Sequence, residues 1–359
     1  MIYDVLVVGA GQAGLATAYS LQQQGLNFRI LEAGERASGS WPSYYDSLRL
    51  FSPARYSSLP GLVFPGDLKR YPYRDEVVEY LEHYAKFFDF PITFNTRVTT
   101  IERHGMIFSI QSGQQRWQAR TVVVASGSFN QPNIPDFLGL HQFKGQVLHS
   151  SDYHRPTDIK GQRVVVVGAG NSAVQIAYEL SQNHDVILTS RQPPYFIQQR
   201  PFGKDIHFWL RLSGLDTSSF GTRFLSSRAT QVLDTGRYRQ ALADGHITWK
   251  PMFYHLDEHS VCWSDEERSI DTLLLATGFI HQPSYLEGLE GYDAPTAFQQ
   301  KNGISLYIPG LYFVGTSWQR AHASATLRGV GADARYVVKH LQHYLESSGS
   351  LGKLELGCC

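Results

Sequence analysis

The sequence contains few cysteines, no long apolar run and no excess of charge of either sign. Its 359 residues include three cysteines, Cys262, Cys358 and Cys359, without a C-x-x-C pair, which excludes a dithiol redox centre and a zinc knuckle. No apolar run approaches the ~20 residues needed to span a bilayer, and the chain starts without a basic segment or an apolar signal core. We therefore expect a cytoplasmic protein with no integral membrane segment and no metal site.

Charge and catalytic motifs exclude further classes of function. Lysine plus arginine and aspartate plus glutamate number 32 each, so no overall field attracts nucleic acid or anionic lipid. Neither a G-x-S-x-G nor an H-E-x-x-H motif is present, and the 14 histidines are scattered along the chain. We therefore predict neither a protein nucleophile nor an acid–base pair, and no nucleic-acid partner.

A short β-branched run near the amino terminus leads into a first glycine-rich turn. The segment YDVLVVGAGQAGLATAYSLQQQG has a strand pattern, then G-x-G-x-x-G, then small and apolar residues at helical spacing, which is the context of a dinucleotide-binding turn. Glu32 ends the next strand pattern, where a carboxylate suits the hydroxyls of an adenosine ribose. The alternative is a structural helix cap without a ligand. The predicted nucleotide-binding residues are Gly9, Gly11, Gln12, Ala13, Gly14 and Glu32.

The same unit recurs later, in RVVVVGAGNSAVQIAYELSQNHDVILTSRQ, with a difference in charge. Its turn has Gly168, Gly170 and Ala173, and the position equivalent to the acid of the first unit is Arg191. A guanidinium there can bind a 2′-phosphate, with Ser190 beside it, so this unit is predicted to bind NADPH in preference to NADH. One such charge-assisted contact is worth ~1.5–3 kcal/mol. The alternative is a solvated surface arginine.

Two such units imply two dinucleotides, which we interpret as a retained FAD and a transient NADPH. Each unit is followed by an apolar strand that ends in a small-residue turn, at 121–135 and at 272–279. The predicted fold is α/β, with two Rossmann-like domains of three layers, each a mainly parallel sheet flanked by helices. The predicted domains are 1–155 with 283–348 for FAD and an inserted domain, 156–282, for NADPH. Residues 349–359 are expected to form a disordered tail.

Between the two units, the stretch FKGQVLHSSDY resembles the linker motif F-x-G-x-x-x-H-x-x-x-(Y/F)-(K/R) of the flavin-containing monooxygenases, the class B flavoproteins, most closely their small bacterial members. Phe143, Gly145, His149 and Tyr153 are in register, while His154 stands at the last, basic position. The resemblance implies a hinge between the FAD and NADPH domains, near the nicotinamide. Tyr153 stands where the related Baeyer–Villiger enzymes have tryptophan, which favours heteroatom oxidation over ketone insertion.

The resemblance extends over most of the chain, to about residue 345, and implies further cofactor contacts. It includes GSW after the first unit, the G-x-G-N-S-A form of the second turn, and the closing segment YFVGTSWQRAHASATLRGVGADA. The last resembles the return strand and the helix that complete a flavin site. The residues that it adds are Ser40, Trp41, Trp318 and Gln319 for FAD, and Asn171 and Ser172 for NADPH.

One departure from the family concerns the flavin side of the pocket. Larger members have an asparagine beside the flavin, whereas the comparable stretch here reads LRLFSP. The pocket candidates are therefore Phe51, Ser52 and Tyr45. The aromatic and basic region 193–212 is expected to form a lid or substrate entrance, a membrane-surface element, or an ordinary amphipathic helix over a core.

The family resemblance also implies the chemistry. NADPH reduces FAD, oxygen forms a C4a-hydroperoxide, and a soft sulfur or nitrogen atom of a small sulfide, amine or related molecule is oxygenated. The alternatives are an NADPH oxidase or electron-passing flavin reductase, ketone oxygenation as a side activity, and a redox-sensing flavoprotein without turnover. A homodimer is left open.

Overall fold

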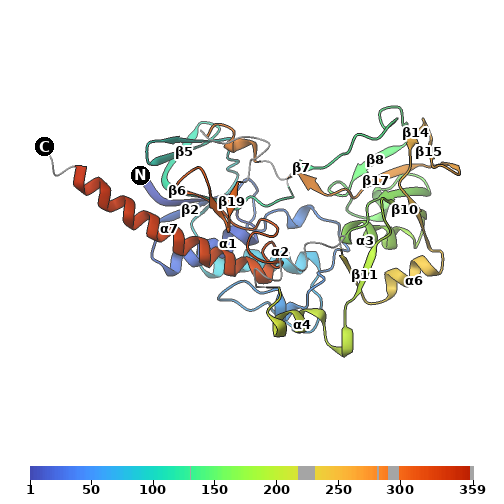
Figure 1. Ribbon diagram of the computed structural model, residues 1–359, viewed down its shortest axis with the longest axis horizontal. Coiled ribbons are helices and arrows are strands. Elements are labelled where there is room, and N and C mark those ends of the chain that lie inside the picture. Colours follow the sequence, from blue (N-terminus) through green and yellow to red (C-terminus); the bar gives the residue numbers. More distant parts are fainter. Residues whose placement is uncertain (130, 217–230, 281–282, 290–298, 356–359) are drawn as a thin grey trace.

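The computed structural model describes residues 1–129, 131–216, 231–280, 283–289 and 299–355, with side chains to residue 348. Within them the chain forms two mainly parallel sheets that lie side by side along the long axis of the molecule (Figure 1). The α/β fold predicted from the sequence is confirmed. None of the described helices combines the length and the apolar character that a membrane span requires.

The first sheet is built around β1 (Ile2–Val8), the strand that leads into the first glycine-rich turn. Its order is β19-β20-β21-β6-β1-β2-β3, and the four pairs from β21 to β3 are parallel. The end of the chain therefore returns beside its beginning. The other strands are β2 (Phe28–Leu31), β3 (Ile92–Thr93), β4 (Thr100–His104), β5 (Ile107–Ser112), β6 (Gln115–Val124), β19 (Gln300–Lys301), β20 (Ile304–Ser305) and β21 (Leu311–Phe313), and the helices are α1 (Gln12–Gln23), α2 (Arg74–Phe87) and α7 (Leu327–Glu355).

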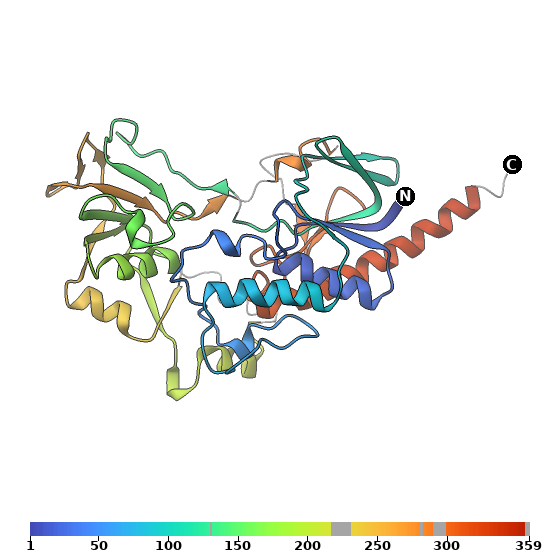
Figure 2. The same cartoon turned by 180° about the vertical axis from the view of Figure 1, so that it is seen from behind.

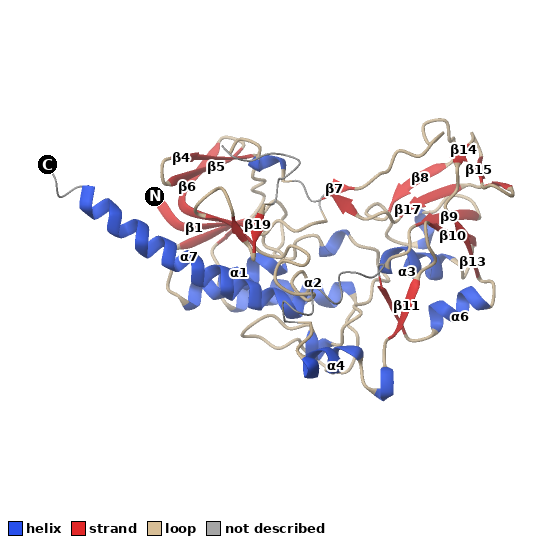
Figure 3. Cartoon of the chain, viewed as in Figure 1, coloured by secondary structure: helices blue, strands red, loops and turns tan. Residues whose placement is uncertain are grey.

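Side-chain alternation along β1 divides the core of this half into two layers. Val5 and Val7 pack against residues of α1, α2 and α7, whereas Leu6 and Val8 pack against β4 and β5 on the other face. This division follows from the period of two in a strand. The half has three layers, but the third is an antiparallel β structure where helices were predicted (Figure 3).

The second sheet is entirely parallel and contains β9 (Arg163–Val167), the strand before the second glycine-rich turn. Its order is β13-β10-β9-β17-β8. Val164 and Val166 face α3 and α6, whereas Val165 and Val167 face β14 and β15 of a small antiparallel sheet. The remaining elements are β8 (Gln146–His149), β10 (Asp185–Ser190), β13 (Ile247–Pro251), β14 (His255–Leu256), β15 (Ser260–Cys262), β16 (Glu267–Ser269), β17 (Thr272–Leu275), α3 (Asn171–Leu180) and α6 (Arg237–Ala243).

Two short strands connect the halves. β7 (Gln131–Pro132) leaves the first half, β18 (Phe279–Ile280) leaves the second, and the two pair antiparallel. They lie between the two sheets when the molecule is seen from either side (Figure 2). The stretches 121–135 and 272–279, which the sequence singled out separately, therefore meet each other.

The predicted domain limits differ from the structure at two places. β8 belongs to the second sheet, so the first junction falls before Gln146 and not at residue 155, because the linker motif itself contributes a strand. The expected disordered tail is also partly wrong. Helix α7 continues to Glu355, and residues 356–359 lie outside the described part of the chain.

The region 193–212 contains one strand and one helix. β11 (Tyr195–Gln198) pairs with β12 (Gln231–Asp234), and α4 (Ile206–Ser213) follows. Short 3-10 turns occur at η1 (Trp41–Ser43), η2 (Ala54–Tyr56), η3 (Pro156–Asp158), η4 (Pro201–Gly203) and η5 (Ser284–Leu286).

Candidate functional site

Steric contacts explain two of the three glycines in the first turn. Gly9 has a φ of +102°, and a Cβ there would lie 2.8 Å from the carbonyl oxygen of Ala125; a Cβ on Gly14 would lie 1.8 Å from the carbonyl oxygen of Gly9. The turn thus packs against the end of β6 and against its own helix. A Cβ on Gly11 would make only an ordinary 3.5 Å contact with Gly39. The protein's own packing does not require glycine at this position, which fits a role in close backbone approach to a ligand.

The carboxylate of Glu32 is held beside this turn. Its Oε2 accepts a hydrogen bond of 2.5 Å from the Ala10 N–H, and its Oε1 accepts one of 2.7 Å from the Gly34 N–H. Glu32 therefore has a structural role, because its side chain positions the turn. A carboxylate has about four lone-pair sites, so each oxygen retains acceptor capacity for a ribose hydroxyl.

The helices that follow both turns begin without a capping side chain. The residues at the N-cap positions are Gly11 for α1 and Gly170 for α3, and neither helix has an acidic residue in its first turn. The first N–H groups and the positive end of the helix dipole are therefore available for a phosphate.

The second turn also requires glycine for steric reasons, and it carries a buried polar side chain, that of Asn171. Gly168 has a φ of +145°, and a Cβ there would lie 2.5 Å from the carbonyl oxygen of Ala276 and 3.0 Å from the Cβ of the buried Ala173. The Oδ1 atom of Asn171 is buried and has no hydrogen-bond partner among the described residues. A buried acceptor without a donor is costly, so this atom fits a contact with a bound nucleotide. Ser172 is exposed on the same turn.

The two residues predicted to bind a 2′-phosphate differ in availability. Arg191 follows directly after β10 and is exposed, and it forms no ion pair with a carboxylate in the described ranges. Ser190 is buried, donates its hydroxyl proton to the carbonyl oxygen of Gln192 at 2.7 Å, and accepts from the Trp249 indole N–H at 3.0 Å. Because the only proton of Ser190 is used, Arg191 is the better candidate for the phosphate.

The histidine of the linker motif is buried at the junction of the halves. The Nδ1 atom of His149 accepts from the Ser151 N–H at 3.1 Å, and its Nε2–H donates to the carbonyl oxygen of Gly278 at 3.0 Å. Burial lowers the pKa of His149, so the ring is neutral at neutral pH. Both ring nitrogens are used within the protein. The residue therefore joins the end of β8 to the turn after β17 and does not present a free acid or base.

The other motif residues are packing residues. Phe143 lies in the core between the second sheet and β14, and a Cβ on Gly145 would lie 2.3 Å from the Phe143 ring. Tyr153 is fully buried and donates its hydroxyl to Glu179 of α3 at 2.6 Å. The motif thus anchors the segment that enters the second half to the second sheet and to α3.

Tyr45 lies in the core of the second half and not in the pocket that the sequence predicted. This residue was predicted to line a pocket, but it packs in the core of the second half, with its ring 6.4 Å from that of Tyr153. Its hydroxyl donates to Gln175 of α3 at 2.8 Å, and burial raises its pKa. The prediction was wrong because the sequence does not show that the segment after GSW crosses to the other half.

An aromatic row links the GSW segment to the linker motif. Trp41 contacts Tyr44, Tyr44 contacts Phe129, Phe129 contacts Phe279, and Phe279 contacts His149, with ring centroids 5.0–6.0 Å apart. The hydroxyl groups of Ser40 and Tyr44 lie 3.3 Å apart beside this row. The sequence did not identify Phe129 and Phe279, although both lie in the two stretches that it singled out. Their meeting depends on the pairing of β7 with β18.

The region 193–212 covers the segment that contains Phe51. Gln199 donates to the carbonyl oxygen of Phe51 at 2.6 Å, and the ring of Phe51 stacks on His207 of α4 at 6.1 Å. Phe51 lines a cavity of about 80 Å³. Ser52 is buried and is hydrogen-bonded to Ser57 at 3.0 Å, so its hydroxyl is used within the protein.

A larger cavity of about 260 Å³ lies between the segments 53–71 and 200–208 and is mainly basic. Its charged lining residues are Arg55, Lys69, Arg200, Lys204 and Asp205. The carboxylate of Asp205 already accepts from Tyr71 at 2.5 Å and from His207 at 2.6 Å. The lining of this opening beside region 193–212 therefore carries an excess of positive charge.

The closing segment returns to the first turn. A Cβ on Gly315 would lie 2.6 Å from the Cβ of Ala13, and the Gln12 side chain donates to the carbonyl oxygen of Ala325 at 2.6 Å. Trp318 has a φ of +60° and is 43% exposed, whereas Gln319 is buried and donates to the carbonyl oxygen of Phe313 at 2.9 Å. Trp318 is thus available to a ligand, and Gln319 shapes the turn that carries it.

Sequence reasoning also missed a buried ion pair at the start of α7. The Nε of Arg328 lies 3.2 Å from Asp216, and both side chains are nearly inaccessible. Burial lowers the pKa of Arg328, and burial together with this guanidinium lowers the pKa of the neighbouring His322. The sequence shows only an arginine in a segment of otherwise small residues. This pattern does not identify Asp216, 112 residues earlier, as its partner.

Comparison with known proteins relates this arrangement to characterised folds. The model of the pyridine nucleotide-disulphide oxidoreductase family matches residues 6–211. An uncharacterized oxidoreductase, CzcO-like, from Geobacillus kaustophilus is 35% identical over 96% of this chain and 99% of its own length. A probable indole-3-pyruvate monooxygenase, YUCCA9, from Arabidopsis thaliana is 28% identical over 91% of this chain and 88% of its own. The solved flavin-containing monooxygenase from Stenotrophomonas maltophilia matches with a TM-score of 0.83 and 30% identity, over 96% of this chain and 99% of that one.

Proposed function

The chain belongs to the flavin monooxygenases of the pyridine nucleotide-disulphide oxidoreductase family, and on this premise we propose that it oxygenates a soft sulfur or nitrogen atom of a small molecule. It is an NADPH-dependent oxidoreductase with FAD and NADPH as cofactors. The disulfide chemistry in the family's name finds no support in this sequence, because its three cysteines include no C-x-x-C pair.

The residues of the two turns have separate roles in this proposal. The first turn holds the pyrophosphate of FAD through the N–H groups at the start of α1, and Glu32 receives the ribose hydroxyls. The second turn holds NADPH in the same way, with Asn171 as an acceptor and Arg191 on the 2′-phosphate. FAD supplies the redox chemistry, accepting a hydride and activating oxygen.

The protein contributes orientation and exclusion of water. The pairing of β7 with β18 links the two halves, and the His149 contact with Gly278 holds the turn that leads into β18. The connection between the two nucleotide turns is thereby held in place. The aromatic row from Trp41 to His149 lies along this junction. Apolar rings there would keep water from the reacting atoms.

One observation favours heteroatom oxygenation over ketone insertion. Tyr153 stands at the motif position where the Baeyer–Villiger enzymes have tryptophan, and it is fully buried against Glu179. A larger indole would not fit this position without a shift of α3, because buried side chains are close-packed.

A second candidate is oxygenation of a 2-oxo acid. It is favoured by the similarity to YUCCA9, the probable indole-3-pyruvate monooxygenase of Arabidopsis, and by the basic cavity beside region 193–212, which suits a carboxylate.

Product analysis separates these functions. The purified protein is incubated with NADPH, oxygen and a panel of sulfides, amines, ketones and 2-oxo acids, and the oxygenated products are identified by mass spectrometry while NADPH and hydrogen peroxide are measured. The proposal expects S- or N-oxides in amounts that match NADPH consumption. Products from 2-oxo acids alone would favour the second candidate. Hydrogen peroxide without any oxygenated product would identify an oxidase, and no turnover would favour a redox sensor.

A further inference from the structure

Three side chains with metal-binding atoms meet on one face of the small sheet formed by β14, β15 and β16. His255 and Cys262 are direct partners across the antiparallel pair of β14 and β15. Asp257 lies two residues after His255 and therefore projects to the same side. The hairpin turn between them is closed by a hydrogen bond of 3.0 Å from the Asp257 N–H to the carbonyl oxygen of Ser260.

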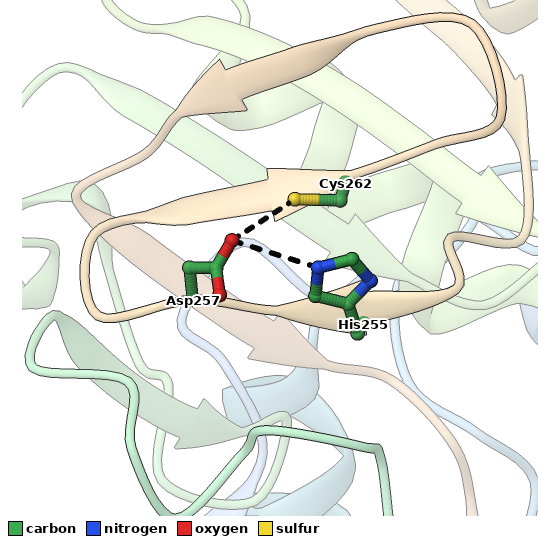
Figure 4. Close-up of side chains that lie close together, drawn as sticks. All are labelled: His255, Asp257 and Cys262. Atoms are coloured by element: carbon green, nitrogen blue, oxygen red, sulfur yellow. Dashed lines mark hydrogen bonds and ion pairs between the residues drawn. The ribbon is translucent and has the colours of Figure 1, made fainter.

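The distances among these side chains are close to those of ligands around one ion. The Oδ2 atom of Asp257 lies 3.3 Å from the Sγ of Cys262 and 3.5 Å from the Nε2 of His255, and the three ligand atoms all lie within 4.8 Å of one another (Figure 4). Zinc binds sulfur at about 2.3 Å and nitrogen or oxygen at about 2.0–2.2 Å, so two ligand atoms of a tetrahedral site lie roughly 3.3–3.7 Å apart. The two Asp257 distances already fall in this range, and rotation of the exposed parts of the side chains would bring the His255 and Cys262 ligand atoms to it from their present separation within 4.8 Å.

We propose that His255, Asp257 and Cys262 bind one divalent transition-metal ion of the zinc class. An imidazole, a carboxylate and a thiolate together favour a cation of intermediate softness over Mg²⁺ or Ca²⁺, which prefer oxygen ligands alone. Glu267, the partner of Cys262 on β16, adds negative charge next to the site. The fourth position is left to water.

The position of the cluster indicates a structural role. β14 and β15 lie at the opposite end of the molecule from the carboxyl end of α7 (Figure 1). Leu256 and Val261, which alternate with the three ligand residues, face the second sheet and pack in its outer core. An ion would therefore hold together the hairpin whose other face covers that core.

The same hairpin is attached to the start of the linker motif. The Lys144 N–H donates to the carbonyl oxygen of Glu258 at 2.7 Å, and the Lys144 ammonium pairs with the Glu258 carboxylate at 2.6 Å. The Leu256 N–H also donates to the carbonyl oxygen of Leu138 at 2.9 Å. A bound ion would thus also stabilise the segment that enters the hinge.

A redox role for Cys262 is less consistent with its surroundings. Burial and the neighbouring Asp257 raise the pKa of the thiol to about 11, and the thiolate is the reactive form in disulfide exchange and oxidation. The thiol instead donates a hydrogen bond to Asp257. A metal ion would displace that proton, because a coordinating thiol is deprotonated by the ion.

Metal binding by the full-length protein tests this proposal. Because thiols at the carboxyl terminus can also bind metal, the parent variant carries Cys358→Ser and Cys359→Ser. Equilibrium dialysis against Zn²⁺, followed by elemental analysis, is expected to give one ion per chain. Titration with Co²⁺ is expected to give the intense visible bands of a tetrahedral site with a thiolate ligand.

Single substitutions in this parent identify the ligands. Cys262→Ser and His255→Ala are each expected to weaken Zn²⁺ binding by at least about 10- to 100-fold, the loss typical even for residues that only support a ligand. Asp257→Asn, at an exposed position, keeps the proposal testable if a core substitution impairs folding. His259→Ala changes an exposed histidine of the same hairpin outside the cluster and should leave binding unchanged. Binding that survives all three ligand substitutions, or a parent that retains no Zn²⁺, overturns the proposal.

Discussion

The Nε2–H of His149 donates to the carbonyl oxygen of Gly278 at 3.0 Å and so joins the last residue of β8 to the turn that follows β17. Those two strands are neighbours in the second sheet, and the chain passes through β18 to the other half directly after Gly278. The histidine of the linker motif therefore acts as a positioning residue for the connection between the halves. Its tautomer is set by the Ser151 N–H, which occupies Nδ1.

Replacement of this ring is expected to cost stability. His149→Ala leaves the Ser151 N–H without its acceptor, at about 1–3 kcal/mol for one unsatisfied group. The carbonyl oxygen of Gly278 also loses one of its two donors and keeps the Asn133 N–H at 2.9 Å. The free energy of unfolding, measured by chemical denaturation, should fall by at least about 1 kcal/mol. His246→Ala, at an exposed site, is the control. Equal stability of the two variants would contradict the positioning role.

The same residue predicts the direction of the pH dependence. Burial lowers the pKa of His149 below the ordinary value of 6.5, so below about pH 6.5 the unfolded state binds a proton that the folded state does not. The free energy of unfolding should therefore decrease as the pH falls below 6.5, by up to about 1.4 kcal/mol per pH unit for one such group. His207 and His322 are shifted in the same direction.

Denaturation curves at several values between pH 5 and pH 7.5 measure this decrease. His149→Gln removes one titrating group, so its stability should depend less on pH than that of the parent. If His149→Gln and the parent show the same dependence of stability on pH, His149 does not bind a proton selectively in the unfolded state over this range.

Arg191 is expected to distinguish the two nicotinamide coenzymes. Arg191→Ala removes the guanidinium proposed to contact the 2′-phosphate, which is worth ~1.5–3 kcal/mol, so kcat/KM for NADPH should fall roughly ten- to a hundredfold while that for NADH is unchanged. Steady-state kinetics with both coenzymes give the ratio. Arg335→Ala, also exposed, is the matched control. A loss of the same size with both coenzymes would place the 2′-phosphate elsewhere.

The glycines of the first turn should separate folding from cofactor binding. In Gly14→Ala the new Cβ would lie 1.8 Å from a backbone oxygen, so misfolded or insoluble protein is expected. In Gly11→Ala the new Cβ meets only an ordinary contact within the protein, so the variant should fold, with normal circular dichroism, but bind FAD at least tenfold more weakly. Gly288→Ala, which also has room for a Cβ, should retain its flavin. A yellow Gly11→Ala protein with parental FAD affinity would disprove the assigned role of Gly11.

Local sequence determined the parts of the molecule whose requirements are local. The valine runs before Gly9 and Gly168 became the central strands of two parallel sheets, and the glycine spacing became the turns. The reason is steric: a backbone with positive φ, or a helix start in contact with its own strand, excludes a side chain. The difference between Glu32 and Arg191 was also visible from spacing alone, because each residue follows its turn at the same distance.

Tertiary structure decided which distant segments meet. Tyr45 contacts Gln175 across 130 residues, and β7 pairs with β18. No local pattern specifies these contacts, since they depend on how two sheets from different parts of the chain pack. The sequence therefore placed Tyr45 in a pocket and assigned the linker strand to the wrong half.

The cluster of His255, Asp257 and Cys262 shows the same division on a smaller scale. Their spacing matches no metal motif, and the sequence predicted no metal site. The three side chains share a face only because the antiparallel register sets His255 opposite Cys262, and register in a hairpin is fixed by its turn and by burial of the opposite face. The sequence supplied the ligand atoms and the nucleotide turns, and the packing of strands from separate parts of the chain brought them into chemical contact.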